Sequence, residues 1–251
     1  MSDIHTDTSR LFQSEHITIV DINGNRKPSD ILLACDIMLN IFLDNNGEQK
    51  LIKSLPALCD NLLELCVGIF LSEGLIHSYS DIKAIVFEDD ALNKTQNAYV
   101  TLHESHTHSC DSSKAQAVLP VSYNNERIFE IADMLKRDTP IHSMTGGTHS
   151  CFLFDNKNLY CSTEDISRHN AFDKAIGYAL INGINLAGCM IFTSARISPE
   201  MVIKTVNAKI PVLISKSVPT KEAVCLAKQY NLTLLCKAGN DSFVEFAADT
   251  D

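Results

Sequence analysis

From Pro120 onward, short apolar segments alternate with longer segments in which apolar residues recur at helical spacing. This alternation is typical of a mainly parallel sheet that is covered by helices. We therefore expect an α/β domain over residues 120–248. The expected helices are Ile128–Leu135, Phe172–Leu180 closed by Gly183, Pro199–Val206, and Lys221–Tyr230 capped by Thr220. The expected strands are Cys151–Phe154 and Asn158–Cys161, which form a hairpin, and Ala187–Phe192, Val212–Ile214 and Leu232–Leu235.

Residues 17–119 follow a different pattern, which predicts a smaller N-terminal α+β domain. Asn23-Gly24 is a dipeptide typical of hairpin turns, and strand-like segments flank it. Residues 1–16 are polar, and we expect them to form a tail. The expected elements are a hairpin of Ile17–Val20 with Ile31–Ala34, a helix from Leu62 to Phe70 that stops near Gly74, and strands at Ile82–Phe87 and Tyr99–Leu102.

The charge of the chain is concentrated in its first half. The 251 residues carry a net charge of −10. Residues 1–143 contain 11 basic and 21 acidic side chains, whereas residues 144–251 contain 10 of each. The acidic half argues against binding to nucleic acid or to anionic membranes, and the neutral half can still hold a local cationic pocket. No apolar run reaches the roughly 20 residues of a membrane span, and the N-terminus lacks a signal pattern. We expect a cytoplasmic protein with reduced thiols, since none of the nine cysteines forms a C-x-x-C pair.

Two polar motifs flank the expected Cys151–Cys161 hairpin. The first, Thr145–Ser150, contains Gly146-Gly147, and glycines let backbone N–H groups approach an anion closely. The second, Glu164–Lys174, brings an arginine and a histidine to the start of a helix, where anions are favoured. A tight turn and simple helix capping are the alternative interpretations of these motifs taken singly. Together they favour a pocket for a charged small molecule.

Two further motifs follow consecutive buried strands. Ser194–Met201 comes after the first strand and Ser215–Thr220 after the second, and each leads into a helix. Ligands of α/β sheets gather at this edge, where the carboxyl ends of the strands lie. Arg196 and Ser198 are candidates for holding phosphate or ribose oxygens. The pair of motifs predicts a nucleotide-like ligand.

The polar segment His103–Gln116 is a candidate domain boundary and a candidate active loop, because loops longer than about 12–15 residues are usually functional or disordered. His106, His108 and Cys110 are spaced by two residues, but zinc requires three or four converging ligands. We favour a flexible loop with incidental histidines, and expect no tightly bound metal. A thiolate at Cys110 is the other candidate: it can act as a nucleophile and carry a terminal sulfur as a persulfide.

The ordered motifs resemble those of one known family, the formate dehydrogenase accessory sulfurtransferases (FdhD). Members of that family have the motifs T-G-G-x-H-x-A, E-D-x-G-R-H-N-A-x-D-K, S-G-R-x-S-x-E-M and S-x-S-A-P-T. The corresponding segments here are Thr145–Cys151, Glu164–Lys174, Ser194–Met201 and Ser215–Thr220. Phe70–Ile76 resembles another family segment, and the resemblance extends over residues 17–246.

The resemblance implies a cytosolic homodimer whose main domain is a cytidine-deaminase-like three-layer α/β/α fold. It also implies a sulfurtransferase that takes sulfur from a cysteine desulfurase and passes it to the molybdenum bis(molybdopterin guanine dinucleotide) cofactor of formate dehydrogenase. Cys110 would carry the sulfur as a persulfide. The residues expected to bind the cofactor are His149, Arg168, His169, Asn170, Arg196, Ser198, Lys237, Ala238, Gly239, Asn240, Asp241 and Ser242.

The chain departs from the family pattern at the reactive loop. Relatives have C-G-x-C-G there, whereas this chain has Cys110-Asp111-Ser112-Ser113. A single thiolate can accept and donate a persulfide, but it cannot relay the sulfur to a second cysteine. Ala195 and Pro199 also replace the family's glycine and serine. A cofactor-binding chaperone with weak or no sulfur transfer is therefore the alternative function, and a zinc hydrolase or deaminase is a third class.

Overall fold

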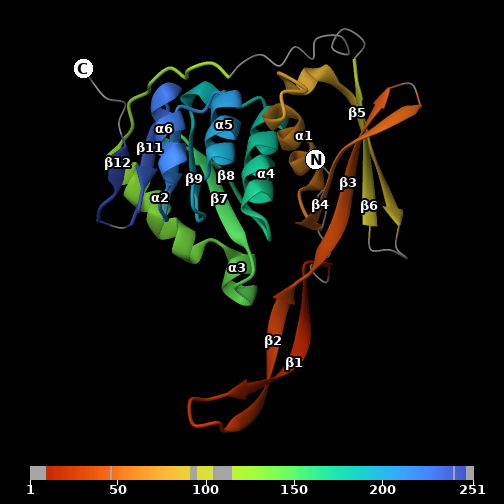
Figure 1. The fold of residues 1–251 in the computed structure, drawn as a ribbon, viewed down its shortest axis with the longest axis vertical. Coiled ribbons are helices and arrows are strands. Elements are labelled where there is room, and N and C mark those ends of the chain that lie inside the picture. Colours follow the sequence, from red (N-terminus) through yellow and green to blue (C-terminus); the bar gives the residue numbers. More distant parts are fainter. Residues whose placement is uncertain (1–9, 46, 91–94, 104–114, 240, 247–251) are drawn as a thin grey trace.

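The computed structural model describes residues 10–45, 47–90, 95–103, 115–239 and 241–246 (Figure 1). Its strands form a sheet of six, a sheet of four and a projecting two-stranded arm. The helices are α1 (Leu62–Ser72), α2 (Asn125–Arg137), α3 (Pro140–Thr145), α4 (Arg168–Ile181), α5 (Pro199–Asn207) and α6 (Lys221–Gln229). Within these described ranges, no helix is both long and apolar enough to cross a membrane.

The six-stranded sheet has the order β12-β11-β10-β9-β7-β8. The pairs β9–β10 and β10–β11 are parallel, whereas the pairs β7–β8, β7–β9 and β11–β12 are antiparallel. The expectation of a mainly parallel sheet is therefore wrong. The hairpin of β7 with β8 was expected, but β9 then pairs antiparallel with β7, and the short turn after β11 brings β12 back antiparallel to it. The bounds are β7 His149–Phe154, β8 Leu159–Asp165, β9 Met190–Thr193, β10 Val212–Ser215, β11 Thr233–Cys236 and β12 Val244–Phe246.

Helices cover both faces of this sheet. Successive strand residues point to opposite sides, and here both sides carry apolar residues that must be covered. On one face, Phe152, Phe192 and Ile214 pack against α2. On the other face, Leu153, Ile191 and Leu213 belong to the larger cluster that includes α4, α5 and α6. The expected strand at Ala187–Phe192 begins later, at Met190, because Leu186–Gly188 forms a 3-10 turn that the Asn185 side chain caps.

The four-stranded sheet has the order β4-β3-β6-β5, and the sequence interpretation missed two of its strands. β3 is Asp36–Asn45, β4 is Glu48–Leu58, β5 is Ile82–Asp90 and β6 is Thr95–Leu102. α1 lies between this sheet and α4, as Figure 1 shows, and one continuous hydrophobic cluster joins all three. This cluster contains residues from both sides of position 120, and the proposed division into two domains stays a prediction.

The two glycines that the crossing of α1 and α4 requires are Gly68 and Gly177. A Cβ atom on Gly68 would lie 1.8 Å from the Asp173 carbonyl oxygen, and one on Gly177 would lie 1.8 Å from that of Glu64. Any side chain at either position would force the helices apart. The close crossing places the first turns of α4 beside the segment that links β4 to α1.

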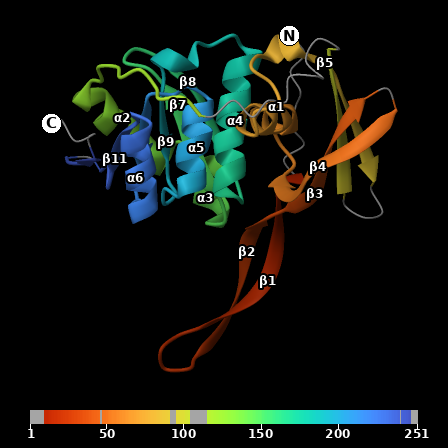
Figure 2. The ribbon, with the colours of Figure 1, turned by 45° about the horizontal axis from the view of Figure 1, so that its top comes forward.

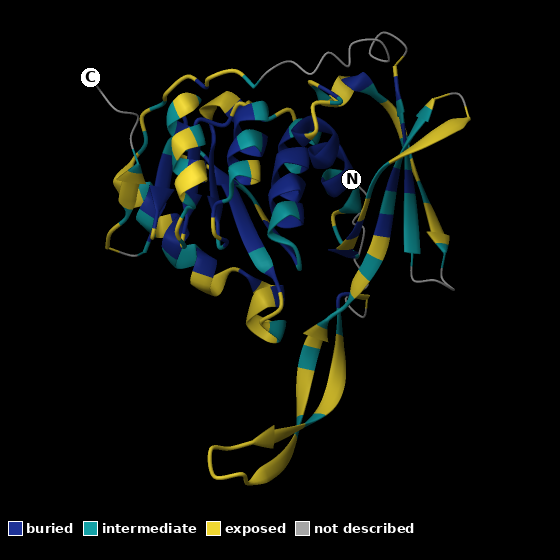
Figure 3. Cartoon of the chain, in the orientation of Figure 1, coloured by how far each residue is buried: buried dark blue, intermediate teal, exposed yellow. Residues whose placement is uncertain are grey.

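A β-hairpin arm, β1 (Phe12–Val20) paired with β2 (Arg26–Ala34), projects from the body (Figure 2). Most of its residues are exposed, as Figure 3 shows in yellow. A hairpin about the Asn23-Gly24 turn is confirmed, with Gly24 at φ +84°. The predicted pairing is wrong, because Ile17–Val20 pairs with residues 26–29 and the segment Ile31–Ala34 pairs with residues 12–15. The predicted tail is wrong from Leu11 onward, because Leu11 packs with Leu58 and Ile141 at the base of the arm. Residues 1–9 lie outside the described part of the chain.

Candidate functional site

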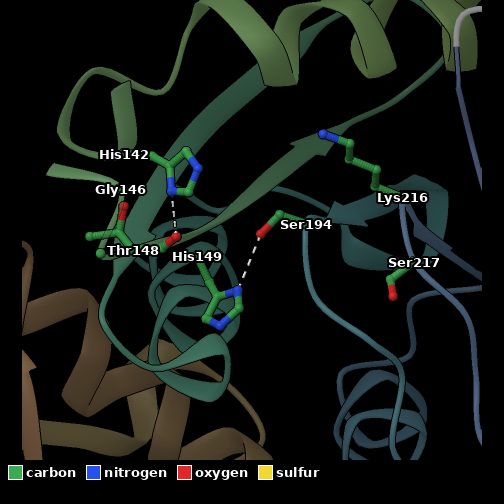
Figure 4. Close-up of a pocket in the computed structure, with 8 residues that line it drawn as sticks. His142, Gly146, Thr148, His149, Ser194, Lys216 and Ser217 are labelled. Carbon is green, nitrogen blue, oxygen red and sulfur yellow. Dashed lines mark hydrogen bonds between the residues drawn. The ribbon is translucent and has the colours of Figure 1, made fainter. Parts of the chain in front are cut away.

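A pocket of about 550 Å³ opens at one edge of the six-stranded sheet (Figure 4). Three of the four sequence motifs meet there: the turn before β7, the residue after β9 and the residues after β10. In Figure 4, two histidines lie on one side, Lys216 and Ser217 on the other, and Ser194 between them. The lining residues are His142, Gly146, Gly147, Thr148, His149, Ser194, Lys216 and Ser217.

The N–H groups of Gly146 and Gly147 do not serve the pocket as donors for an anion, although the sequence suggests this role. Gly146 has φ +66° and ends α3, and its N–H donates to the carbonyl oxygen of His142 at 2.7 Å. The N–H of Gly147 donates to the Thr145 hydroxyl at 3.2 Å. Both N–H groups are therefore engaged within the turn, contrary to the expectation that they face an anion. The donors for a ligand are side chains.

His142 and His149 are the titratable groups of the first wall. The Nδ1 atom of His142 lies 2.7 Å from the Thr148 carbonyl oxygen. A carbonyl only accepts, so this nitrogen carries a proton and Nε2 is left for a ligand. His149 Nδ1 lies 3.4 Å from the Ser194 hydroxyl. Burial, together with the positive charges of Arg168 and His142, lowers the pKa of His149 below its ordinary value.

This lowered pKa predicts a pH dependence for anion binding. His149 is mainly neutral near pH 7, and a bound anion offsets the neighbouring positive charges and raises its pKa. Binding then takes up a proton, so the affinity for inorganic pyrophosphate should increase as the pH falls from about 8 to about 6. Calorimetric titration of wild type and His149→Gln measures this effect. We expect a shallower pH slope in the variant; equal slopes would show that His149 does not face the anion. Pyrophosphate itself also binds protons in this pH range, but this contribution to the slope is the same for wild type and variant and cancels in the comparison.

Glu164 organises the wall that carries these histidines. Its carboxylate accepts hydrogen bonds from the N–H groups of Ile141 and His142, at 2.9 and 2.7 Å, and from the Thr148 hydroxyl at 3.0 Å. The side chain is buried, so these three donors satisfy a charge that is shielded from water. The sequence signal for this role was an acidic residue at the end of a strand, and the sequence interpretation assigned it no role of its own.

Much of the remaining Glu164–Lys174 motif holds the fold together. Lys174 is completely buried and lies 2.6 Å from an Asp60 oxygen and 2.8 Å from an Asp165 oxygen. The Asn170 amide donates to the Pro56 carbonyl oxygen at 2.8 Å and to the Asp165 carboxylate at 3.0 Å. Because both of its N–H groups have these partners, Asn170 accounts for the packing of α4 against β4. Its predicted contact with a cofactor stays a prediction.

Arg168, His169 and Ser198 lie at the starts of α4 and α5. Within the described part of the chain, Nε of Arg168, Nδ1 of His169 and Oγ of Ser198 are buried and have no hydrogen-bond partner. Nε2 of His169 lies 3.7 Å from a Glu200 carboxylate oxygen. Buried polar groups without partners are costly, and a bound water or ligand relieves that cost. These three residues do not line the pocket itself, nor does Arg196, which is exposed two residues before Ser198.

The segment 237–242 is attached to the second wall. The N–H groups of Lys237 and Ala238 donate to the carbonyl oxygens of Ser217 and Ser215, at 2.8 and 3.0 Å. Gly239 N–H donates to the Ser242 carbonyl oxygen at 3.0 Å, which closes the turn into β12. Asp241 is exposed and Ala238 is packed in the core, so the segment supports the wall through its backbone. Asn240 lies outside the described residues.

Cys110 also lies outside the described residues, as do His106 and His108. The flanking positions are fixed: His103 N–H donates to the Asp81 carbonyl oxygen, and Val118 N–H donates to that of Tyr230. The helix α6 begins on the same side of the sheet as the pocket, at the carboxyl ends of β9 and β10, and Tyr230 follows its last turn. Val118 therefore lies on the opposite side, at the amino ends of these strands. The pocket and Val118 are separated by the length of α6, roughly 14 Å. In the parts of the chain that the structure describes, no group of three or more His, Cys, Asp or Glu side chains is arranged to hold a metal ion.

Comparisons with known proteins agree on one family. The family model described as FdhD/NarQ matches residues 34–250. Proteins named sulfur carrier protein FdhD from Bacillus pumilus and Bacillus subtilis are 29% and 30% identical to this chain, over 79% and 73% of it and 82% and 78% of their own length. One from Methanothermobacter thermautotrophicus is 28% identical over 86% of this chain and 88% of its own. The crystal structure of a formate dehydrogenase accessory protein from Desulfotalea psychrophila has the same fold, with a TM-score of 0.79 at 22% identity, over 95% of this chain and 98% of that one.

Proposed function

The chain belongs to the FdhD/NarQ family, and from this premise we propose that it is a sulfur carrier whose persulfide forms on Cys110. The sulfur comes from a cysteine desulfurase. It passes to the molybdenum bis(molybdopterin guanine dinucleotide) cofactor before this cofactor enters the catalytic subunit of formate dehydrogenase. The proposal includes a cytoplasmic homodimer and a cytidine-deaminase-like layering of the main domain. The names of the relatives, sulfur carrier proteins, support the carrier role.

The observation that carries the proposal is the meeting of three separate motifs in one pocket with cationic and hydroxyl side chains. Lys216 and the two histidines supply positive or switchable donors, and Ser194 and Ser217 supply hydroxyl groups. Such donors suit the phosphate oxygens of a nucleotide. The unpartnered atoms of Arg168, His169 and Ser198 lie at two helix starts, where anions are also favoured. These groups lie outside the pocket lining, and together with the pocket they support our proposal that this side of the protein binds the guanine dinucleotide part of the cofactor.

The chemistry of the other thiols supports Cys110 as the sulfur acceptor. Burial raises the pKa of Cys151, Cys161, Cys189 and Cys236 to about 12, and it also raises that of Cys59 and Cys66. Thiols with such pKa values form little thiolate at neutral pH, and the thiolate is the nucleophile in sulfur exchange. Among the described cysteines this leaves Cys35, which is half-buried, and Cys225, which is exposed. Cys110 alone is surrounded by hydrophilic residues in the sequence.

The second candidate function is a chaperone that binds the cofactor without efficient sulfur transfer. Ser113 favours it, because relatives have a second cysteine at this position and a lone cysteine cannot relay its sulfur. Both functions require the pocket. Only the carrier requires the Cys110 thiol.

Nucleotide binding tests the pocket directly. We expect Lys216→Ala to weaken the binding of guanosine diphosphate by about tenfold, since a charge-assisted hydrogen bond to phosphate is lost. Calorimetric titration of the purified protein gives the Kd. Lys221→Ala is the matched control, because Lys221 is an exposed lysine at the start of α6 and does not line the pocket. Equal affinities of wild type and Lys216→Ala would place the nucleotide elsewhere and remove the main support for the proposal.

A further inference from the structure

The face of the four-stranded sheet that points away from α1 has an apolar row across all four strands. Phe42 in β3 is opposite Leu51 in β4 and Tyr99 in β6, and Tyr99 is opposite Val86 in β5. The rings of Phe42 and Tyr99 are stacked, with centroids 5.2 Å apart and an interplanar angle of 20°. Leu51 and Val86 are 52% and 54% exposed. We call this surface, formed by the alternate residues of β3–β6 that include these four, the outer face.

The other face of the same sheet is buried, so the exposure of the outer face is not a general property of these strands. Leu39, Ile41, Ala98 and Val100 alternate with the outer residues and pack in the core with α1. A polar row lies next to the apolar row and is held by hydrogen bonds. The Asn40 amide donates to the Asn97 oxygen at 3.0 Å, and the Ser54 hydroxyl donates to the Asn40 oxygen at 2.7 Å. An aromatic centre beside fixed polar groups is the composition of a protein–protein interface.

The net negative charge of residues 36–102 indicates which kind of partner the outer face would bind. Residues 36–102 contain ten Asp and Glu residues, four Lys residues and no Arg. The strand register places Asp44 and Glu88 on the outer face. It places Lys53 on the opposite face, which packs against α1, and the Lys53 ammonium group lies 2.7 Å from a Glu73 carboxylate oxygen. A negative surface repels nucleic acid and anionic lipid and attracts a basic protein surface. The aromatic pair therefore does not serve as a base-stacking platform.

The position of β6 indicates what the partner does. β6 ends at Leu102, and after His103 the chain enters the segment that contains Cys110. A protein bound on the outer face is thus bound next to the strand that leads to the proposed sulfur acceptor. The face measures roughly 20 by 20 Å from strand spacing and rise, which suits a small, transient contact. A donor that delivers sulfur and then leaves needs such a contact.

We propose that the outer face is the docking surface of the sulfur donor, a protein whose contact surface is basic and partly apolar. This inference rests on the proposed role of Cys110. In the transfer, the Cys110 thiolate attacks the terminal sulfur of the donor's cysteine persulfide, and a new S–S bond forms. The S–S bond of the donor breaks, and its electron pair leaves on the donor's cysteine thiolate. The exchange needs no oxidant or reductant.

The test compares a protein donor with a small one. The double variant Leu51→Lys with Val86→Lys and the single variant Glu88→Lys are treated with a cysteine desulfurase and cysteine, or with inorganic polysulfide. Ile22→Lys is the matched control, because Ile22 is an apolar residue at the arm tip and is fully exposed. We expect sulfur loading of Cys110 by the desulfurase to slow by about tenfold in the outer-face variants and to be unchanged in the control. Loading by polysulfide should be equal in all of them.

Equal loading rates by the desulfurase in the outer-face variants and wild type would overturn the docking proposal while leaving the carrier role intact. A change of oligomeric state in these variants would also overturn it, because the face would then be a contact between two copies of the chain. Failure of polysulfide to load Cys110 in the wild type would instead contradict the proposed function. Glu88→Lys changes one exposed side chain and keeps the test informative if the double variant does not fold.

Discussion

Cys110→Ala is expected to restore no formate dehydrogenase activity in a strain that lacks its own accessory protein, whereas the wild-type chain restores it. The reason is chemical: alanine has no thiolate to accept the sulfur, and the other cysteines near the core are held as thiols by burial. Formate dehydrogenase activity in cell extracts is the measurement, with the amount of variant protein determined in the same extracts.

Cys225→Ala is the matched control for this experiment. Cys225 is an exposed cysteine on α6, and we expect its removal to leave the rescue unchanged. Rescue by Cys110→Ala at the wild-type level would favour the cofactor-binding chaperone over the sulfur carrier. Loss of rescue in both variants would indicate a general effect of cysteine removal and would contradict the specific role of Cys110.

Lys174→Met is expected to lower the free energy of unfolding by about 3–5 kcal/mol, the typical effect of removing one partner from a buried ion pair. Lys174 and Asp165 are both completely buried, and Lys174 also contacts Asp60. Without the ammonium group, Asp165 is left in the core without its counterion. The Lys174 side chain also donates to the Glu164 carbonyl oxygen at 3.1 Å, so the wall of the pocket loses a support.

Urea unfolding monitored by circular dichroism measures this loss as a lower midpoint at an unchanged slope. Lys157→Met is the control, because Lys157 is an exposed lysine in the turn between β7 and β8, and its replacement should change stability by less than about 0.5 kcal/mol. If Lys174→Met unfolds at the wild-type midpoint, the ion pairs are not what holds α4 to the β4–α1 segment.

Elements with a strong local signal could be predicted from the sequence. The β1–β2 hairpin has its Asn-Gly turn, α1 ends at a glycine with positive φ (Gly74, φ +72°), and the Thr220 hydroxyl caps α6 by accepting from the Ala223 N–H. The missed pair of strands, β3 and β4, has a weaker pattern, because a β-bulge near Ile41 interrupts its register. The antiparallel β7–β8 hairpin was predicted correctly, but the antiparallel pairing of β7 with β9 and of β11 with β12 was not, since the pattern within a strand does not show which strand it pairs with.

The candidate site shows the same division between local and tertiary information. The position of the pocket could be predicted, because motifs after successive strands must meet at one sheet edge. The roles of the individual side chains could not be predicted from the sequence. Asn170 and Glu164 are polar residues at element ends, where a ligand contact and a tertiary hydrogen bond have the same sequence signature. His142 has no motif of its own, and a tertiary hydrogen bond of its ring with the Thr148 carbonyl oxygen holds it in the wall of the pocket.

Intact-protein mass spectrometry after incubation with a cysteine desulfurase and cysteine tests the sulfur-carrier role most directly. We expect the wild-type chain to gain one sulfur, about 32 Da, as a persulfide that peptide mapping locates at Cys110 and that a reductant removes. Cys110→Ala should gain none, and Cys225→Ala should gain the same mass as wild type. An unmodified wild-type chain, or equal labelling of wild type and Cys110→Ala, would contradict the account.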